Sequence, residues 1–330
     1  MAISDYEKQY IKALSNIYHN GFADGTNERT GKQTKRLPGI VIRIDVEKEF
    51  PILKSKFVAG KTALREILWI WQQQSNNIHD LKAHIWDNWA DQNGAIGKAY
   101  GYQMNRPISI HTDTINKTTE SFRSYENQAK YILEYLREFP NGRWGVATLW
   151  NPEELAGMNL VPCCHTSTWN LDGGRLNCVL DQRSGDMPYG VPFNTTQYAE
   201  LMILLARDLG VKPGILTHVI ADAHIYDNQM DGVDLQLKCY DMLTAMNGYM
   251  KKESTFVKNL AEIVCNTWNA TQPEKIKVND VLCHADEAIH TVPVFNVNSE
   301  ETDFFKITAN DCAILNYNHM GKISFGDVTV

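Results

Sequence analysis

A strand–helix–strand succession in the middle of the chain limits the possible folds more than any other feature. Residues 175–182 and 215–222 are expected strands, and residues 195–209 form a strong amphipathic helix between them. Gly210 and Pro213 end that helix, because glycine terminates helices and proline cannot continue them. A helix between two strands buries its apolar stripe against their sheet, so we expect a layered α/β structure.

The flanking sequence predicts further elements in an irregular order. Apolar spacing predicts helices at residues 5–20, 61–74 and 124–138. Strand-like composition predicts strands at residues 39–44 and 146–150, with a β-like run at 323–330. Because strands and helices do not alternate regularly, we predict the α/β (α+β) class, with a mixed β-sheet packed by helices.

Composition excludes several classes of protein. With 43% hydrophobic and 22% charged residues among 330, the chain is typical of a soluble globular protein. Its net charge of −7 disfavours a nucleic acid partner, which requires a basic surface. The polar start lacks a signal core, no apolar stretch is long enough to span a membrane, and the seven cysteines form no CxxC pair. We therefore expect a cytoplasmic protein with reduced thiols.

A cysteine followed by three polar motifs carries the functional signal. The motifs are Leu160-Val161-Pro162-Cys163-Cys164, Gln182-Arg183-Ser184-Gly185-Asp186, Gly190-Val191-Pro192-Phe193-Asn194 and His224-Ile225-Tyr226. A thiolate is the best nucleophile that a protein offers near neutral pH, and a neighbouring cation favours it. Cys163 is the candidate nucleophile and Cys164 is its competitor. In an extended segment their side chains point to opposite sides.

The polar motifs suit a nucleotide. Arg183 and Ser184 fit a phosphate, although an arginine there also fits a surface salt bridge. Asp186 is either a turn residue or an acceptor for a heterocycle N–H. His224 and Tyr226 are two residues apart, so on a strand they face one side and can reach a ribose hydroxyl.

Asn194 has two readings that do not exclude each other. It precedes the expected helix, where asparagine is a common N-cap. Its carboxamide also offers a donor and an acceptor, which match the O4 and N3–H edge of uracil, whereas an aspartate would suit cytosine. Asn194 is therefore a candidate for recognising a pyrimidine.

Glu66 lies on the apolar stripe of the helix expected at 61–74. A carboxylate is costly to bury, so Glu66 either reaches water or has a raised pKa and a chemical role. We favour general acid–base chemistry, which needs such a pKa. Trp86, Trp89 and Tyr100 offer a wall for a flat cofactor ring, or they pack in the core.

Residues 239–295 differ from the rest of the chain. They contain two weak helical runs, at 240–251 and 254–268, and no clean period. Cys283, His284 and Asp286 lie close together there, but their spacing fits no standard metal site. We therefore predict no metal.

Taken in order, these motifs resemble the thymidylate synthase family in its folate-dependent, cysteine-using form. The resemblance extends over residues 5–238 and weakly over 292–330. Besides the motifs above, it rests on Glu66-Ile67-Leu68-Trp69, Ile85-Trp86-Asp87 and Asp222-Ala223-His224-Ile225-Tyr226. Counting back from Gln182 without a gap places the family's nucleophile on Cys163.

The resemblance implies a fold, a reaction and a dimer. The fold is a mixed, twisted β-sheet packed by helices, and the sheet forms the interface of a homodimer. The reaction is the reductive methylation of dUMP to dTMP, with 5,10-methylenetetrahydrofolate as cosubstrate and without a metal. Cys163 adds to C6 of the pyrimidine, while Glu66 and ordered water manage the proton transfers.

The same resemblance assigns roles residue by residue. Catalytic roles go to Cys163, Glu66, Arg183, Asp186 and Asn194. Substrate binding goes to Arg29, Arg143, Gln182, Arg183, Ser184, Asn194, His224 and Tyr226, with Arg143 donated to the phosphate site of the partner subunit. Folate binding goes to Trp86, Trp89, Leu160, Asp186, Gly190 and Val330, and the segment that ends at Val330 closes over the ligands.

Three features depart from the family pattern. Many members have two adjacent arginines at a position where this chain has Arg143 and Trp144, and an indole cannot replace a guanidinium. We therefore expect weaker phosphate binding or a compensating cation. Cys164 stands where many members have histidine, which alters the surroundings of the pyrimidine O4. Residues 239–295 form an insertion in an otherwise single catalytic domain over 1–330.

Two alternative functions are open at this point. A dUMP hydroxymethylase would let water trap the methylene intermediate, and Trp86, which is expected to shield that intermediate, favours methylation instead. A non-catalytic nucleotide-binding relative would bind dUMP without turnover, a reading that Trp144 motivates.

Overall fold

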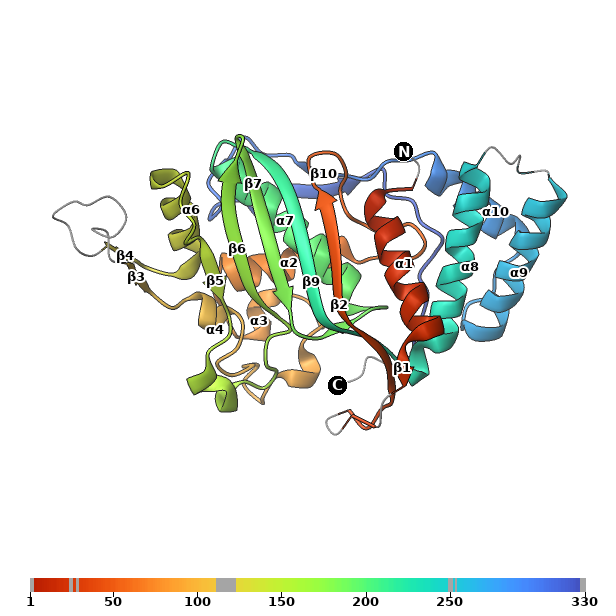
Figure 1. Cartoon of the computed structure of the whole chain (residues 1–330), viewed down its shortest axis with the longest axis horizontal. Helices are drawn as coiled ribbons and strands as arrows, with labels where there is room; N and C mark the ends of the chain where they lie inside the picture. The colour runs from red at the N-terminus through yellow and green to blue at the C-terminus, as the bar shows by residue number, and fades with distance from the viewer. Residues whose placement is uncertain are drawn as a thin grey trace.

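The centre of the computed structural model is a seven-stranded sheet (Figure 1). The structure describes residues 3–23, 26–27, 30–110, 123–248, 252 and 254–326. The strand order is β1-β2-β9-β7-β6-β5, and β8 pairs with β9. Strand bounds are β1 Phe22–Ala23, β2 Thr34–Asp45, β5 Val146–Thr148, β6 Cys164–Asp172, β7 Arg175–Gln182, β8 Gly185–Asp186 and β9 Lys212–Tyr226.

The sheet is mixed, as predicted. Strands β7 and β8 run parallel to β9, and the other neighbours are antiparallel. The parallel pair β7–β9 requires a crossover, which helix α7 (Gly190–Asp208) supplies. This is the strand–helix–strand unit that the sequence predicts, with a helix that starts earlier than expected.

Helix α7 lies between the sheet and helix α2 (Gly60–Trp71). Most of its side chains are buried, as is typical of a helix that is covered on several sides. Alternate residues of the strands, among them Ile42, Leu180 and Ile220, are fully buried and form the core with α2 and α7. The two helices therefore carry their polar residues into the interior, where each polar group needs a partner.

The remaining elements surround this core. Helices are α1 Asp5–Asn20, α3 Ile78–Leu81, α4 Gly101–Met104, α6 Gln128–Glu138, α8 Met230–Asn247, α9 Thr255–Thr271 and α10 Val278–Ile289, with 3-10 turns at Asp87–Trp89, Pro152–Gly157 and Asp227–Gln229. Two small hairpins pair β3 Ile108–Ile110 with β4 Arg123–Tyr125, and β10 Val294–Val297 with β11 Cys312–Leu315. Among the described helices none is long and apolar enough to cross a membrane.

Several expected element boundaries are wrong. Helix α7 begins at Gly190, so Asn194 lies inside the helix and is not its N-cap. Helix α6 begins at Gln128, because the Asn127 side chain accepts the Lys130 N–H as a cap, and residues 123–125 form β4. Residues 323–326 are not a strand, and the rest of the expected β-like run lies outside the described residues.

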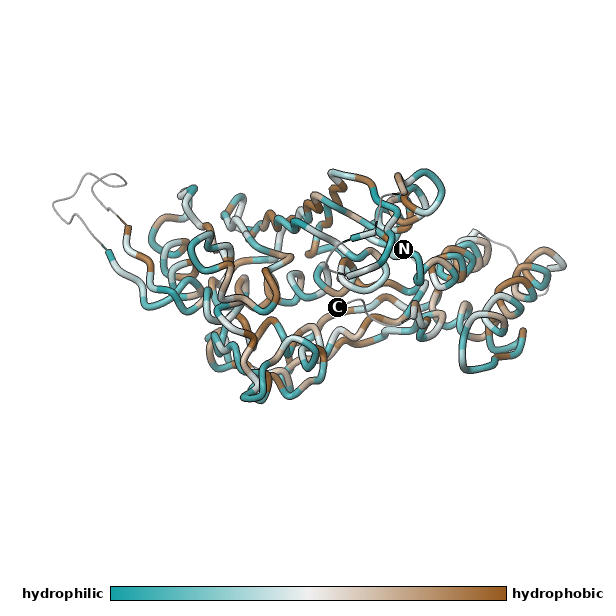
Figure 2. The backbone as a smooth tube through the Cα atoms, turned by 90° about the horizontal axis from the view of Figure 1, so that it is seen from below, coloured by the Kyte–Doolittle hydropathy of each residue, from teal (hydrophilic) through white to brown (hydrophobic). Residues whose placement is uncertain are grey.

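Residues 239–295 contribute to a cluster of three helices at one end of the molecule (Figures 1 and 2). Helix α8 starts before residue 239 and packs on α1, α9 and α10. Helix α10 was not expected from the sequence. Helices α9 and α10 show the mixture of hydrophobic and hydrophilic residues that amphipathic helices require (Figure 2).

Candidate active site

Cys163 and Cys164 point to different environments, as the extended segment predicts. Cys164 is buried in the core, whereas Cys163, one residue before β6, is half-buried. The Cys163 N–H donates to the Tyr100 hydroxyl at 3.2 Å. A shift of register between Cys164 and Thr166 interrupts the pairing of β6 with β7 beside the two cysteines. Cys163 is therefore the more accessible thiol.

Arg183 is held against the segment that carries Cys163. Its backbone N–H donates to the Cys163 carbonyl at 2.9 Å. Its guanidinium donates to the carbonyls of Pro162 at 3.0 Å and Val161 at 2.7 Å, and lies 3.9 Å from the Cys163 Sγ. A fixed cation at this distance favours the thiolate form of a cysteine. These contacts, and not a surface salt bridge, hold the Arg183 guanidinium in place.

Glu66 is buried between two donors. The Trp86 indole N–H donates to one carboxyl oxygen, and the Gln197 amide donates to the other. Burial raises the pKa of Glu66 to about 7, although both hydrogen bonds lower it. The apolar stripe thus predicted the raised pKa correctly. A carboxyl group with this pKa exchanges protons near neutral pH.

Trp86 and Tyr100 connect Glu66 to Cys163. The rings of Trp86 and Tyr100 are 4.9 Å apart at their centroids, and Trp89 packs on Trp86 at 5.4 Å. Tyr100 adopts φ +46°, an uncommon conformation for a residue with a side chain, and its hydroxyl accepts the Cys163 N–H. The aromatic cluster therefore positions the thiol and the carboxyl group relative to each other.

Gln182 is at the centre of a buried polar network. Its side-chain nitrogen lies 2.8 Å from the Ser184 carbonyl and 3.3 Å from the Asn194 Oδ1. Its side-chain oxygen lies 2.7 Å from the His218 Nε2 and 3.4 Å from the Cys164 Sγ. On the far side of the imidazole, the Thr195 hydroxyl lies 3.0 Å from the His218 Nδ1.

The predicted ribose-binding pair lies beside Asp186. The rings of His224 and Tyr226 are 5.0 Å apart, and β8 pairs Asp186 with His224. Asp186 accepts the Tyr189 N–H at 3.0 Å and the Gln229 amide at 2.8 Å. Burial raises the pKa of Asp186 above its usual range, and these hydrogen bonds oppose the shift.

The C-terminal segment lies against the start of helix α7. The Tyr189 hydroxyl accepts the Phe325 N–H at 3.0 Å and donates to the Gly326 carbonyl at 2.9 Å. The Lys56 ammonium lies 5.2 Å from the centre of the Phe325 ring. Burial lowers the pKa of Lys56 to about 8, and the charge of Asp186 opposes that shift.

The other predicted site residues in the described part of the chain have few contacts with the residues described above. Leu160 is half-buried three residues before Cys163. A Cβ added to Gly190 would lie 3.7 Å from the Asn194 Oδ1. Arg143 is exposed and lies ahead of the edge strand β5. Arg29 and Val330 lie outside the described residues.

Within the part of the chain that the structure describes, no three His, Cys, Asp or Glu side chains are grouped closely enough to hold a metal ion. Cys283 and Asp286 lie on helix α10, and the Asp286 carboxylate pairs with Lys252 at 3.7 Å.

Six residues of this region were not identified from the sequence. They are Lys56, Tyr189, Thr195, Gln197, His218 and Gln229. Only Gln197 offered a usable signal, since it follows Asn194 by three residues and so shares one side of a helix with it. The others join residues far apart in the sequence, and no local spacing reveals such contacts.

Comparisons with known proteins agree on one family. The family model described as thymidylate synthase matches residues 8–279. A thymidylate synthase of Clostridium beijerinckii is 42% identical over 238 residues, which cover 71% of this chain and 82% of that protein. Thymidylate synthase 1 of Bacillus subtilis strain 168 is 29% identical over 335 residues, covering 98% and 99%.

A solved structure agrees with the sequence comparisons. The thermostable thymidylate synthase A from Bacillus subtilis superposes with a TM-score of 0.73 at 30% identity, covering 98% of this chain and 99% of that one. A match of this extent includes most of residues 239–295, so a full-length relative has a counterpart of the helical cluster.

Proposed function

The chain belongs to the thymidylate synthase family, and we propose that its reaction, the reductive methylation of dUMP to dTMP, proceeds through the Cys163 thiolate. The protein is thus a methyltransferase that uses a folate. One observation carries the assignment of the nucleophile: Cys163 is half-buried and 3.9 Å from the Arg183 guanidinium, whereas Cys164 is buried in the core.

The proposed chemistry starts at the sulfur. The Cys163 thiolate forms a bond to C6 of the pyrimidine, and the electron pair of the C5–C6 double bond moves towards C5 and O4 as an enolate. Glu66, with a pKa of about 7, populates both protonation states near neutral pH, so it can deliver and accept the protons of the following steps.

A covalent-capture experiment tests this assignment. Incubation with 5-fluoro-dUMP and 5,10-methylenetetrahydrofolate should give a stable adduct whose peptide contains Cys163, detected by mass spectrometry. The Cys163→Ser variant should give none, and the Cys164→Ala variant should retain the adduct. An adduct on Cys164, or no adduct in the unmodified protein, would contradict the proposal.

We propose that Asn194 reads the uracil edge. The Gln182 amide lies 3.3 Å from the Asn194 Oδ1, which leaves the Nδ2 group to donate to an acceptor such as O4. Asn194→Asp should therefore shift the preference towards dCMP, measured as the ratio of kcat/KM for the two nucleotides. An unchanged ratio would show that Asn194 does not select the base.

The sugar and the phosphate have separate proposed partners. His224 and Tyr226, 5.0 Å apart, are proposed to hold the ribose. Arg183 and Ser184, with Gln182 beside them, are proposed to hold the phosphate together with Arg29 and Arg143. Arginine suits phosphate because its planar fork donates two hydrogen bonds at once.

The folate side is proposed to include Trp86, Trp89, Leu160, Asp186 and Gly190, with 5,10-methylenetetrahydrofolate as the cosubstrate. The folate, when bound, supplies the one-carbon unit and the hydride. The Trp86–Trp89 pair offers an aromatic wall, and the N–H of Trp86 is already used by Glu66. Val330 is proposed to close the site with the segment that Tyr189 holds.

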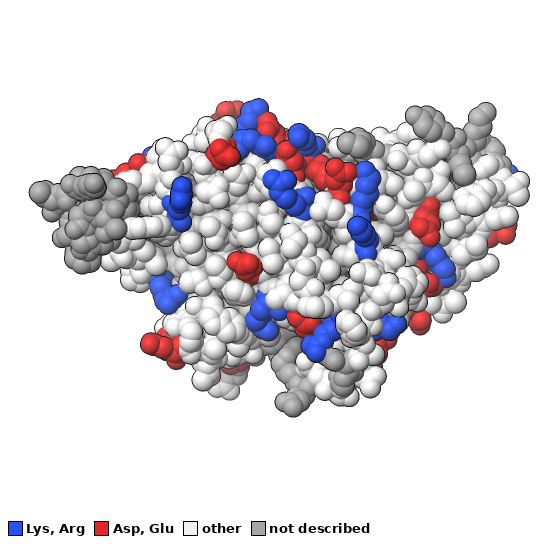
Figure 3. Space-filling view, viewed as in Figure 1, with Lys and Arg blue, Asp and Glu red and all other residues white. Residues whose placement is uncertain are grey.

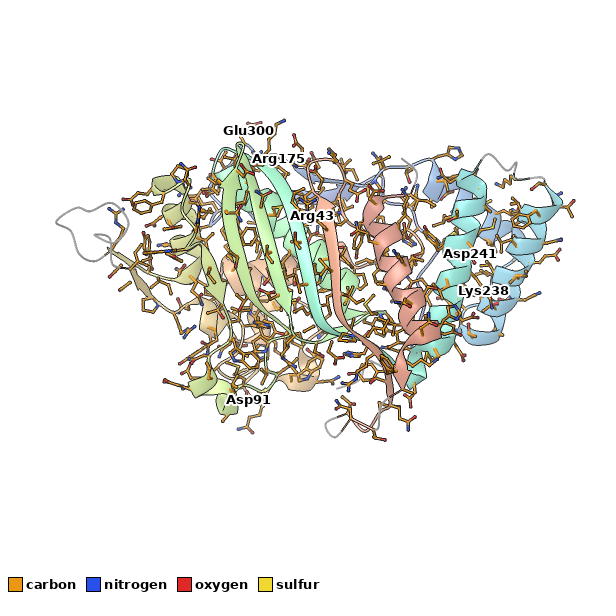
Figure 4. The ribbon with its side chains drawn as sticks, viewed as in Figure 1. Arg43, Asp91, Arg175, Lys238, Asp241 and Glu300 are labelled. Atoms are coloured by element: carbon orange, nitrogen blue, oxygen red, sulfur yellow. The ribbon has the colours of Figure 1, made fainter. Side chains whose placement is uncertain are left out.

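We further propose a homodimer through the open face of the sheet. In Figure 1 no described helix crosses the face that is turned to the viewer, and Figure 3 shows this face as largely uncharged over its central strands. Val41, which is 55% exposed, pairs with Val219 on this face, next to Arg43 on β2 (Figure 4). A second copy would cover these residues and bring in Arg143.

The dimer can be tested with a matched pair of variants. Val41→Glu should give a monomer in sedimentation velocity and lose most activity. Ile263→Glu on helix α9, where Ile263 is 48% exposed, should leave both unchanged. A dimer that survives Val41→Glu would place the interface elsewhere.

The comparisons do not favour the hydroxymethylase or the non-catalytic alternative. We also propose a cytoplasmic location for the protein. We propose a single catalytic domain over 1–330 with an insertion at about 239–295.

A further inference from the structure

The amide of Gln182 has only one orientation that satisfies its surroundings. The Ser184 carbonyl, 2.8 Å away, has no proton to give, so it must accept from the Gln182 N–H. The amide oxygen therefore faces the His218 Nε2 at 2.7 Å and the Cys164 Sγ at 3.4 Å. Because Gln182 is buried, a reversed amide would leave two acceptors in contact.

This orientation determines the tautomer of His218. An oxygen at 2.7 Å requires a proton on Nε2. His218 is fully buried, and its burial lowers its pKa to about 3, so the ring is neutral and Nδ1 carries no proton. The Thr195 hydroxyl lies 3.0 Å from Nδ1 and also donates to the Val191 carbonyl at 2.8 Å, so its single proton is shared between two acceptors.

The same amide fixes Asn194 from the other side. The Gln182 N–H is directed at the Asn194 Oδ1 at 3.3 Å, which identifies that atom as the carbonyl oxygen and leaves Nδ2 as the free donor. Uracil presents an acceptor, O4, to such a donor, whereas cytosine presents an amino group. The donor direction thus passes from His218 through Gln182 to Asn194.

We propose that His218 is a positioning residue for nucleobase selectivity, which holds Gln182 and, through it, Asn194 in the orientation that accepts uracil and rejects cytosine. This inference rests on the proposed role of Asn194. No atom of His218 is required to touch the nucleotide. Thr195 supports the arrangement from within helix α7, with its hydroxyl 3.0 Å from the His218 Nδ1.

Equilibrium binding and kinetics of two His218 variants test the proposal. His218→Phe removes the donor to Gln182 and keeps a ring. The Kd and KM for dUMP should rise about tenfold, the Kd for dCMP should change much less, and kcat for dUMP should change less than KM. The expected size corresponds to one lost hydrogen bond of about 1.4 kcal/mol.

The conservative variant His218→Gln is the rescue, because its amide can donate to Gln182. It should restore the ratio of the dUMP and dCMP dissociation constants to within about threefold of the original. Nitrogen NMR of the unmodified protein should show the proton of His218 on Nε2, and Thr195→Val should weaken dUMP binding whereas Thr195→Ser should not.

The outcomes separate this inference from the proposed function. A dUMP-to-dCMP ratio that is unchanged in folded His218→Phe, or a proton found on Nδ1, would overturn the role of His218. In either case, capture of 5-fluoro-dUMP on Cys163 would still support the thiolate mechanism. An equal loss of dUMP and dCMP binding would reduce His218 to a structural residue and would also overturn the proposal.

Discussion

Helices α2 and α7 pack on each other, and each carries one buried glutamate. The two carboxyl groups differ in the hydrogen-bond donors around them. Glu66 on α2 receives hydrogen bonds from Trp86 and from Gln197 of α7. Glu200 on α7 lies against the first turn of α2, where its Oε1 would be 3.6 Å from a Cβ added to Gly60. Within the described residues neither oxygen of Glu200 has a hydrogen-bond partner.

The difference shows that burial alone does not make a catalytic acid. Burial raises the pKa of Glu66 only to about 7 because two donors favour its charged form. Without donors, burial raises the pKa of Glu200 well above its usual range, so burial favours the protonated form of Glu200. Glu66 can exchange a proton during turnover, whereas burial favours the neutral form of Glu200, and a buried carboxyl group without a hydrogen bond costs folding free energy.

The largest expected effect is the loss of the proton-exchanging group. Glu66→Gln should lower kcat by about 10²- to 10⁴-fold, the usual contribution of general acid–base catalysis. The dissociation constant for dUMP, measured by calorimetry, should change little and serves as the check on folding. A kcat within threefold of the original would move the acid–base role to another residue.

The matched change on α7 should act on stability and not on catalysis. Glu200→Leu removes a buried, unpartnered carboxyl group next to a cavity of about 350 Å³. The free energy of unfolding in urea should rise by about 1–3 kcal/mol, while kcat stays the same. A loss of stability would mean that Glu200 forms an interaction that its unpartnered oxygens do not reveal.

The pH dependence of stability should separate the two carboxyl groups further. Glu200 has a raised pKa in the folded state, so the folded state binds its proton more tightly than the unfolded state. Its contribution to stability is complete below the unfolded pKa of about 4.3 and decreases as pH rises, by at most about 1.4 kcal/mol per pH unit.

Glu200→Leu should therefore flatten the decline of the unfolding free energy between about pH 5 and pH 8, relative to the unmodified protein. Urea unfolding at several pH values measures this slope. Identical slopes in the two proteins would show that Glu200 is not protonated in the folded state.

The smallest expected effect comes from removing one donor to Glu66. Gln197→Met keeps the volume but loses a hydrogen bond that favours the carboxylate, so the pKa of Glu66 should rise. The limb of the kcat–pH profile that reports Glu66 should move to higher pH, and kcat near pH 7 should change by about threefold to tenfold. A shift to lower pH would contradict this account of the pKa.

The two glutamates also show what the sequence could predict. Glu66 was recognisable because it interrupts an apolar stripe on a helix with a clear 3.6-residue period. Glu200 could not be recognised in this way, because α7 is buried on most of its surface and a polar residue on it interrupts no apolar stripe. Because helix α7 begins at Gly190, Asn194 lies inside the helix, and the prediction that Asn194 is its N-cap is wrong.

The features that the sequence did not predict depend on contacts between distant segments. The local motifs singled out Cys163 and Arg183 as site residues, but the sequence did not predict strand β6, whose pairing with β7 brings the two side by side. They did not predict that His218 of β9 would supply an imidazole to the Gln182 amide that Cys164 also contacts. Helix α10 and the β10–β11 hairpin were missed because residues 239–295 have weak periodicity, and hairpin pairing depends on the whole fold.

The contact between Tyr189 and the C-terminal segment has a practical consequence. The Tyr189 hydroxyl accepts the Phe325 N–H and donates to the Gly326 carbonyl. Tyr189 is the residue immediately before helix α7. An affinity tag or fluorescent fusion appended downstream adds chain beyond Gly326, next to the hydroxyl that precedes the helix carrying Asn194. Kinetic measurements on this enzyme should be made with labels at the amino-terminal end, or with the tag removed.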